Sequence, residues 1–290
     1  MRKIEESELI VNPDGSIYHL HITPEQLADN IIVVGDPGRV ETISQYFDVV
    51  EHKVYNREFV THTGMYKGKR LTVLATGIGT DNIDIVMNEL DALVNIDLTT
   101  RTVKDTHKSL NIVRLGTSGA LQEHIPVDSF VFSSYGLGLD GLLNFYKDRD
   151  SVIDKEMTDE FYKFSNWDKD LTKPYIVKAS EELETIISEG MFKGITATAP
   201  GFYGPQGRVL RLELRKPDIN SSLESFKYNG LSVTNFEMET SALYGLGKML
   251  GHQTATVCAI IANRYNKTYS EDYKVTVEKL IELLLDRLSK

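Results

Sequence analysis

The stretch NIIVVGDPGRV, residues 30–40, runs from a β-branched apolar segment into a turn punctuated by glycine and proline. The same design recurs in LTVLATGIGTDN at residues 71–82 and in NIVRLGTSGAL at residues 111–121. Continuous apolar strands of this kind are typical of a sheet that is buried on both faces, which favours largely parallel pairing. The first two turns lead into predicted helices at residues 40–47 and about 81–94. We therefore expect an α/β fold built on these strands.

Further apolar runs extend this pattern toward the C-terminus, and they predict strands at residues 129–134, 194–198, 233–236 and 254–261. The ending VTVEKLIELLLDRL, residues 275–288, carries apolar residues at helical spacing and predicts an amphipathic helix. The polar stretches at residues 97–109 and 147–173 are predicted to be surface insertions, and NKTYSEDYK at residues 266–274 a solvated loop. We predict one domain over residues 1–290, with a mixed, largely parallel central sheet flanked by helices.

Composition excludes several classes of function. The chain of 290 residues has a net charge of −10, whereas a protein that binds nucleic acid duplexes needs a broad basic face. A local basic pocket for a small anion stays possible. The only cysteine, Cys258, lies in the apolar run TVCAII, so we expect a buried, inert thiol and a reducing compartment. We expect a cytoplasmic protein without a membrane partner, because the N-terminus has no apolar signal segment and no run approaches membrane-spanning length.

Arginine side chains that could bind an anion lie in or beside the Gly-containing turns. Ligands of open α/β sheets bind beyond the carboxyl ends of the strands, and a helix that begins there favours negative charge. Arg39 follows GDPG directly, and Arg114 interrupts the apolar strand NIVRLG. A buried guanidinium requires either a ligand anion or a buried carboxylate, and both explanations stay open for Arg114. The turn GIGTDN lacks the last glycine of a dinucleotide fingerprint, and the sequence has no P-loop, so inorganic phosphate fits best.

Two other short stretches have the chemistry of a nucleoside site. In NFEMETSAL, Glu237 and Glu239 stand where a strand is expected to pass into a helix. They are candidates for accepting hydrogen bonds from sugar hydroxyls, or for stabilising the helix N-terminus. In GFYGPQGR, Gln206 both donates and accepts hydrogen bonds and Arg208 only donates, which matches a ring edge with an imide N–H and carbonyl oxygens. Phe202 has the apolar face to stack on such a ring, and the alternative is an ordinary turn.

Taken in order, the motifs GDPGRV, NREF, ATGIG, RLGTSGA, FYGPQGR, NFEMET and IIANR resemble the nucleoside phosphorylase family, specifically its uridine phosphorylase branch. The resemblance extends from about His19 to the last predicted helix. It implies a pentosyltransferase of pyrimidine salvage and nucleoside catabolism that converts uridine and phosphate to uracil and ribose 1-phosphate. It also implies a homodimer, or a hexamer built from dimers, with phosphate as co-substrate and no cofactor. The seven histidines show no metal-ligand spacing, and we expect no metal.

The resemblance also assigns roles to residues. The phosphate-binding set that it implies is Gly35, Arg39, Arg114 and Thr117, with Arg57 contributed by a neighbouring subunit. The base-binding set is Phe202, Gln206, Arg208 and Ile261, with Arg264 as a supporting residue. The ribose-binding set is Thr117, Glu237, Met238 and Glu239, with His19 lent across the dimer to the 5′-hydroxyl. Arg114, Arg208 and Glu239 are the implied catalytic residues.

Some positions distinguish this chain within the family pattern. Glu58 and Ile78 match an interface potassium site, but Asn82 stands where many uridine phosphorylases have serine, so such an ion stays open. Ala262 stands where a larger aliphatic residue is common, which leaves room for a 5-substituted base. Asn263 stands where related purine enzymes place an aspartate that protonates the purine ring. Because an amide cannot supply that proton, we expect purine cleavage to be disfavoured.

The resemblance leaves competing functions. A purine nucleoside phosphorylase is the nearest alternative, and a non-catalytic nucleoside-binding protein of the same fold is an alternative of another class. A nucleosidase that uses water fits less well, since three arginines would then lack an anion.

Overall fold

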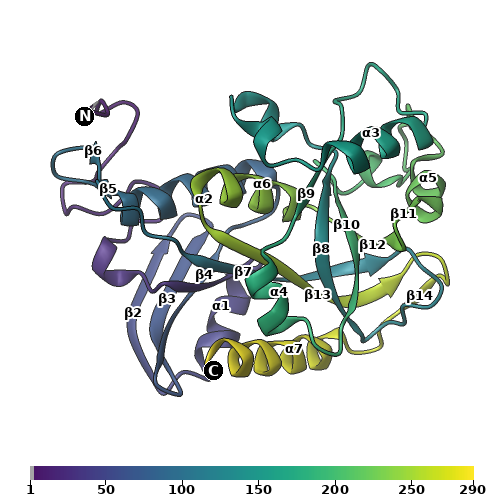
Figure 1. Cartoon of the computed structure of the whole chain (residues 1–290). Helices are drawn as coiled ribbons and strands as arrows, with labels where there is room; N and C mark the ends of the chain where they lie inside the picture. Colours follow the sequence, from purple (N-terminus) through teal and green to yellow (C-terminus); the bar gives the residue numbers. More distant parts are fainter. Residues whose placement is uncertain (1–2) are drawn as a thin grey trace.

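The protein is described by a computed structural model over residues 3–290, in which one mixed sheet runs through the chain with helices on both sides (Figure 1). The strands of this sheet are β1 (Asn30–Val34), β2 (Val49–Asn56), β3 (Phe59–Tyr66), β4 (Lys69–Ala75), β7 (Asn111–Ala120), β8 (Phe130–Gly138), β9 (Tyr175–Lys178), β10 (Phe192–Thr198), β11 (Lys227–Tyr228), β12 (Leu231–Glu237), β13 (Gln253–Asn263) and β14 (Thr268–Tyr269). A separate hairpin pairs β5 (Ile96–Asp97) with β6 (Thr102–Val103).

The strand order of the sheet is β11-β12-β10-β8-β13-β7-β1-β4-β3-β2. The pairs β1–β4, β1–β7, β7–β13, β8–β10 and β10–β12 are parallel, and the remaining pairs are antiparallel. Strand β12 also pairs with β7, where Asn235 lies opposite Ala120. This pairing closes β7, β13, β8, β10 and β12 into a ring, from which β1, β4, β3 and β2 extend as an open wing. The predicted mixed α/β sheet is confirmed.

Helices cover the two faces of the sheet. They are α1 (Pro37–Ser44), α2 (Thr80–Asn95), α3 (Lys155–Phe164), α4 (Glu181–Ile187), α5 (Ile219–Ser225), α6 (Thr240–Leu250) and α7 (Tyr273–Leu288). Helices α2 and α6 pack on each other above the central strands, whereas α7 runs below them and contacts α4 (Figure 1). Among the described residues, no helix combines the length and the apolar character that a membrane span requires.

The structure corrects several predictions of secondary structure. Helix α1 begins three residues before the predicted start, because Pro37 occupies its first turn and the Asp36 carboxylate accepts the Gly38 N–H at 2.9 Å. The stretch at 147–173, predicted to be an insertion, contains α3, which buries Met157 and Phe161. The stretch NKTYSEDYK contains β14 and the start of α7, and so it is not a loop throughout.

Candidate active site

A cavity of about 580 Å³ lies where the carboxyl-terminal ends of β1, β7, β12 and β13 meet. The turn after β1, the second half of β7, the end of β12, the end of β13 and the loop after β10 all reach it. Its lining contains Gly35, Arg39, Arg114, Thr117, Phe202, Gln206, Arg208, Glu237, Met238, Glu239, Ile261 and Arg264. All of the predicted site residues except His19 and Arg57 therefore line this one cavity.

One end of the cavity is cationic. Arg39 lies on the first turn of α1, beside the helix N-terminus, and its Nη1 donates to the Leu115 carbonyl at 3.4 Å. Burial lowers the pKa of Arg39, and the nearby Arg114 lowers it further, while Asp36 opposes both effects. The two guanidinium groups repel each other, and an anion bound to both would offset that repulsion beyond what Glu237 and Glu239 provide to Arg114. This end of the cavity therefore suits phosphate.

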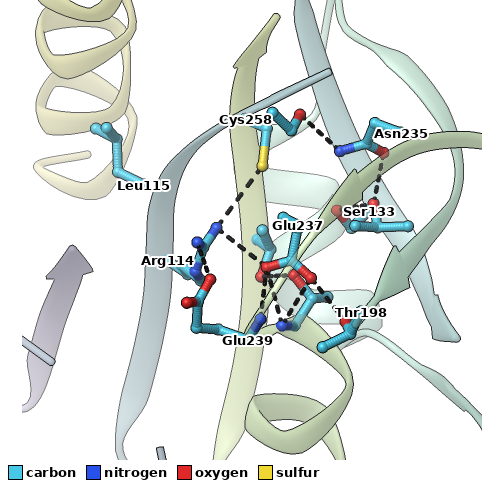
Figure 2. Close-up of polar contacts among 12 residues, drawn as sticks. Arg114, Leu115, Ser133, Thr198, Asn235, Glu237, Glu239 and Cys258 are labelled. Carbon is cyan, nitrogen blue, oxygen red and sulfur yellow. Dashed lines mark hydrogen bonds and ion pairs between the residues drawn. The ribbon is translucent and has the colours of Figure 1, made fainter. Parts of the chain in front are cut away.

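Arg114 is buried, with an exposed fraction of 6%, and two carboxylates hold it (Figure 2). Its Nη2 donates to Glu239 Oε2, and its Nη1 lies 3.3 Å from Glu237 Oε2. Burial alone disfavours the cation, but Glu239 and Glu237 outweigh it and raise the pKa of Arg114 above its ordinary value. The two explanations that the sequence left open for Arg114 thus hold together: it is paired with carboxylates and it lines the ligand cavity.

Glu239 connects the cationic end to the centre of the cavity. Its Oε1 accepts the backbone N–H of Gly79 at 2.8 Å, from the turn before α2. Burial raises the pKa of Glu239, an effect that Arg114 opposes. Each oxygen of Glu239 accepts from one protein donor, so each keeps a lone pair for a further hydrogen bond. The carboxylate has the chemistry to accept a hydrogen bond from a sugar hydroxyl.

The other end of the cavity carries the amide and guanidinium of GFYGPQGR. Gln206 ends a short 3₁₀ turn and is buried, and its Oε1 accepts a hydrogen bond from Arg208 Nη1 at 2.6 Å. The Arg208 guanidinium lies 3.7 Å from the centroid of the half-exposed Phe202 ring. Arg264 Nη2 donates to the Gln206 carbonyl at 2.8 Å, which fixes the turn from beneath. The side chains of Phe202, Gln206 and Arg208 therefore contact one another along this end of the cavity.

Some residues that line the cavity were not predicted from the sequence, and the most important of them is Tyr269. Tyr269 pairs with Ala262 across the β13–β14 hairpin, so both side chains lie on the cavity face. The space beside the small Ala262 side chain is thus bounded by the Tyr269 ring of the neighbouring strand. No glycine marks the turn of this hairpin, which is why the sequence pattern did not reveal it. Other missed lining residues are Asp36, Pro37, Ile78, Gly116, Ser118, Gly119 and Phe236.

His19 and Arg57 do not line the cavity, but they lie close to each other in a second cluster. Asn56 Nδ2 donates to the His19 carbonyl at 2.8 Å, and Arg57 Nη2 donates to the Tyr18 hydroxyl at 3.3 Å. His19 Nδ1 lies 2.6 Å from Glu89 Oε1 of α2. Arg57 is exposed and has a positive φ of 55° in the β2–β3 turn. The exposed Arg57 and the partly buried His19 thus lie at a place separate from this cavity.

The structure gives no support to a role of Asn263 at the base, because its side chain does not line the cavity. Its Nδ2 donates to the carbonyls of Gln122 and Ile125 at 2.9 and 2.7 Å, and its Oδ1 accepts the Asn266 N–H at 2.8 Å. With 1% exposure, this side chain ties β13 to the loop after β7 and is not part of the cavity lining.

We therefore expect Asn263→Asp to destabilise the fold instead of changing the base preference. A carboxylate would face two carbonyl oxygens, which costs about 1–3 kcal/mol of the free energy of unfolding. Urea denaturation measures this loss, and the inosine-to-uridine activity ratio of the folded variant should stay at the wild-type value. A tenfold rise in that ratio with unchanged stability would restore the specificity role.

Within residues 3–290, one group of side chains has the proximity of a metal site. Ligand atoms of Asp91, His107 and His252 lie within 4.8 Å of one another. However, His252 Nδ1 accepts the Leu110 N–H at 3.2 Å, so in the neutral ring Nε2 carries the proton and faces Asp91 at 3.3 Å. Asn95 Nδ2 also donates to Asp91 Oδ1, at 2.7 Å. His252 Nδ1 thus anchors the segment before β7, whereas the buried Nε2 makes no hydrogen bond within residues 3–290.

The ring of strands, with cations, carboxylates and an amide–guanidinium pair around one cavity, defines an α/β protein of the nucleoside phosphorylase type. Residues 29–289 match the family model of the phosphorylase superfamily, and the chain belongs to that family. A solved structure of a Trypanosoma brucei nucleoside phosphorylase, described as showing uridine phosphorylase activity, superposes with a TM-score of 0.84. It is 30% identical in sequence, and the match covers 97% of this chain and 99% of that one.

Two curated relatives show the range of the similarity. A uridine phosphorylase of Thermococcus kodakarensis is 29% identical over 279 residues, which cover 93% of this chain and 86% of that protein. A DeoD-type purine nucleoside phosphorylase of Clostridium perfringens is also 29% identical, over 276 residues that cover 92% of this chain and 97% of that protein. The predicted membership of the nucleoside phosphorylase family is confirmed.

Proposed function

We propose that this protein is a uridine phosphorylase, which converts uridine and inorganic phosphate reversibly to uracil and ribose 1-phosphate. The observation that carries this proposal is the Gln206–Arg208 pair at one end of a cavity whose other end holds Arg39 and Arg114. The pair matches the imide edge of uracil, and the arginines match a phosphate. A uridine phosphorylase and a purine nucleoside phosphorylase have the same sequence identity to the chain, so the similarity does not decide the base. The Gln206–Arg208 pair is the feature that favours uracil.

At the cationic end, Gly35, Arg39, Arg114 and Thr117 would hold phosphate below the anomeric carbon of the nucleoside. Fixing the nucleophile in this position replaces a bimolecular encounter by an aligned attack. Glu239 would accept a hydrogen bond from the 2′-hydroxyl, and Met238 and Thr117 would contact the ribose. The negative charge of Glu239 also favours the positive charge that develops on the sugar ring in an oxocarbenium-like transition state.

At the other end, cleavage of the glycosidic bond leaves negative charge on the departing pyrimidine. Arg208 and Gln206 would stabilise this charge on the ring edge, while Phe202 and Ile261 contact its faces. An interaction that strengthens as the charge develops lowers the barrier, rather than only tightening substrate binding. The reaction then requires no strong general acid and no cofactor, and phosphate is the co-substrate.

The experiment that tests this function is a panel of uridine, thymidine, inosine and adenosine, each with and without phosphate or arsenate. We expect uridine cleavage that depends on phosphate, and little cleavage of the purine nucleosides. Turnover of uridine in phosphate-free buffer would indicate a nucleosidase. Preferential cleavage of inosine would indicate a purine enzyme, and binding without cleavage would indicate a nucleoside-binding protein.

We also propose that each active site is shared between two subunits of a homodimer, or of a hexamer built from dimers. The support is that His19 and Arg57, assigned by resemblance to the partner's site, cluster together outside the cavity of their own subunit. In an isologous dimer the contact works both ways, so two equivalent composite sites result.

Complementation tests this assembly. Arg57→Ala and Arg208→Ala homodimers should each have poor activity, since every site lacks one of its arginines. In a mixed dimer both defects fall in one site, and the other site is intact. Random pairing should restore about a quarter of all sites, because half of the dimers are mixed. Activity of the co-refolded mixture no higher than the mean of the two parents, with mixed dimers confirmed by mass, would place Arg57 outside a shared site.

A further inference from the structure

We infer that Thr198 and Glu237 form a buried positioning pair that holds Arg114 in place for phosphate, and that Glu237 is not a ribose ligand. This inference rests on the proposed function and replaces the ribose-binding role that the family resemblance implied for Glu237. Its basis is the set of hydrogen bonds around the Glu237 carboxylate, which comes from three separate elements of the fold (Figure 2).

The oxygens of Glu237 are already engaged by donors of the protein. Oε1 accepts the Thr198 hydroxyl at 2.6 Å and the Thr240 N–H at 3.1 Å. Oε2 accepts the N–H groups of Glu239 and Thr240, at 2.9 and 3.1 Å, and lies 3.3 Å from Arg114 Nη1. Because the donors come from β10, from the first turn of α6 and from β7, the carboxylate has one orientation that satisfies all of them.

The hydroxyl of Thr198 has an equally definite role. Thr198 is fully buried at the end of β10, and its Oγ1 accepts the Ser241 N–H at 3.0 Å. A hydroxyl has one hydrogen to donate, and with Ser241 as its donor partner it donates that hydrogen to Glu237. The sequence gives no sign of this role, since Thr198 is 39 residues from Glu237 in the chain.

The consequence concerns Arg114, whose guanidinium is shared between two carboxylates. Glu239 pairs with Nη2, and Glu237 pairs with Nη1 from the other side. If Glu237 turned away, Nη1 would keep only its 3.8 Å contact with Cys258 Sγ, and Glu239 would be the one carboxylate left to hold the guanidinium. Thr198 therefore contributes to phosphate binding through two intermediate groups, and it is a positioning residue rather than a catalytic one.

The test compares Thr198→Val, which removes the hydroxyl and keeps the shape, with Thr198→Ser, which keeps the hydroxyl. The control is Thr63→Val. Thr63 is a fully buried threonine of β3 whose Oγ1 makes hydrogen bonds of 2.7 and 2.8 Å to Gln26 and Thr72, outside the cavity lining. For each protein we would measure the phosphate Kd by calorimetry, the KM for phosphate and for uridine, kcat, and Tm.

We expect Thr198→Val to raise the phosphate Kd and KM about tenfold, with a change of less than about threefold in the uridine KM. Thr198→Ser should stay within about threefold of wild type in all constants. Thr63→Val should lower Tm and leave the phosphate constants unchanged. If Thr198→Val does not fold, Thr198→Ala takes its place and the same result is expected.

The inference is overturned if the valine variant binds phosphate as wild type does, or if serine does not preserve phosphate affinity. It is also overturned if Thr63→Val raises the phosphate KM equally, since the effect would then follow from stability. Failure of the proposed function is recognised separately, because the wild-type protein would then not cleave uridine with phosphate. Its phosphate Kd would still report on Thr198.

Discussion

Replacing Arg114 with alanine should abolish detectable phosphorolysis and destabilise the fold by about 3–5 kcal/mol. The variant loses a cation from the phosphate end of the cavity. It also leaves the buried carboxylates of Glu237 and Glu239 without the guanidinium that pairs with both. Uncompensated buried charge is among the few causes that give a single substitution so large an effect. Activity assays and urea denaturation at pH 7.5 measure the two losses.

The pH dependence identifies the cause of this instability. Burial already raises the pKa of Glu239, and Arg114 opposes that effect, so its removal should raise the pKa further. The folded state then binds a proton that the unfolded state releases, and stability falls as pH rises from the unfolded pKa to the folded one. The loss in free energy of unfolding that Arg114→Ala causes relative to wild type should therefore be larger at pH 8 than at pH 5.

Arg215→Ala is the matched control for this prediction. Arg215 also pairs with two carboxylates, Asp168 and Asp170, but the pair is exposed to solvent. We expect its stability and its phosphate KM to be close to wild type, because solvent screens exposed ion pairs. The role of the buried carboxylates would be contradicted if the loss of stability in Arg114→Ala did not change with pH. It would also be contradicted if Arg215→Ala lost as much free energy of unfolding.

Replacing Arg208 with alanine should cost about 2–4 kcal/mol of transition-state stabilisation, seen in kcat/KM for uridine. Arg208 donates to Gln206 and lies over Phe202, so it is poised at the edge where the leaving group gains charge. Burial lowers its pKa, but an arginine stays protonated, and the effect should not depend on pH in the neutral range. The phosphate KM should change little, since Arg208 lies at the opposite end of the cavity.

Arg211→Ala provides the comparison on the same loop. Arg211 lines a neighbouring cavity and not the one that contains Arg114, so its loss should leave kcat/KM near wild type. Activity of Arg208→Ala at the level of Arg211→Ala would mean that the Gln206–Arg208 pair does not stabilise the leaving group.

Local sequence patterns predicted the helices and strands whose apolar residues follow a regular spacing within one segment. The helix expected at about 81–94 is α2, Thr80–Asn95, and the strand expected at 254–261 is β13, Gln253–Asn263. Strand β3 was not predicted, because it is buried on both faces and its buried residues include Thr61, His62 and Thr63. These side chains look solvent-facing in a sequence. His62 and Thr63 are satisfied through partners such as Ser44 and Gln26, which come from other elements, whereas the Thr61 hydroxyl has no hydrogen-bond partner among the described residues.

The sequence by itself determined the class of the fold, the Gly-containing turns and most residues of the cavity, because strand periodicity and turn chemistry depend on neighbours in the chain. Tertiary structure alone decided how those residues are used. Arg114 and Glu239 are 125 residues apart, and the closing of the strand ring brings them into contact. Asn263 faces backbone carbonyls and Tyr269 faces the cavity for the same reason. The direction of a side chain depends on which strands pair, and that pairing is set by the packing of the whole sheet.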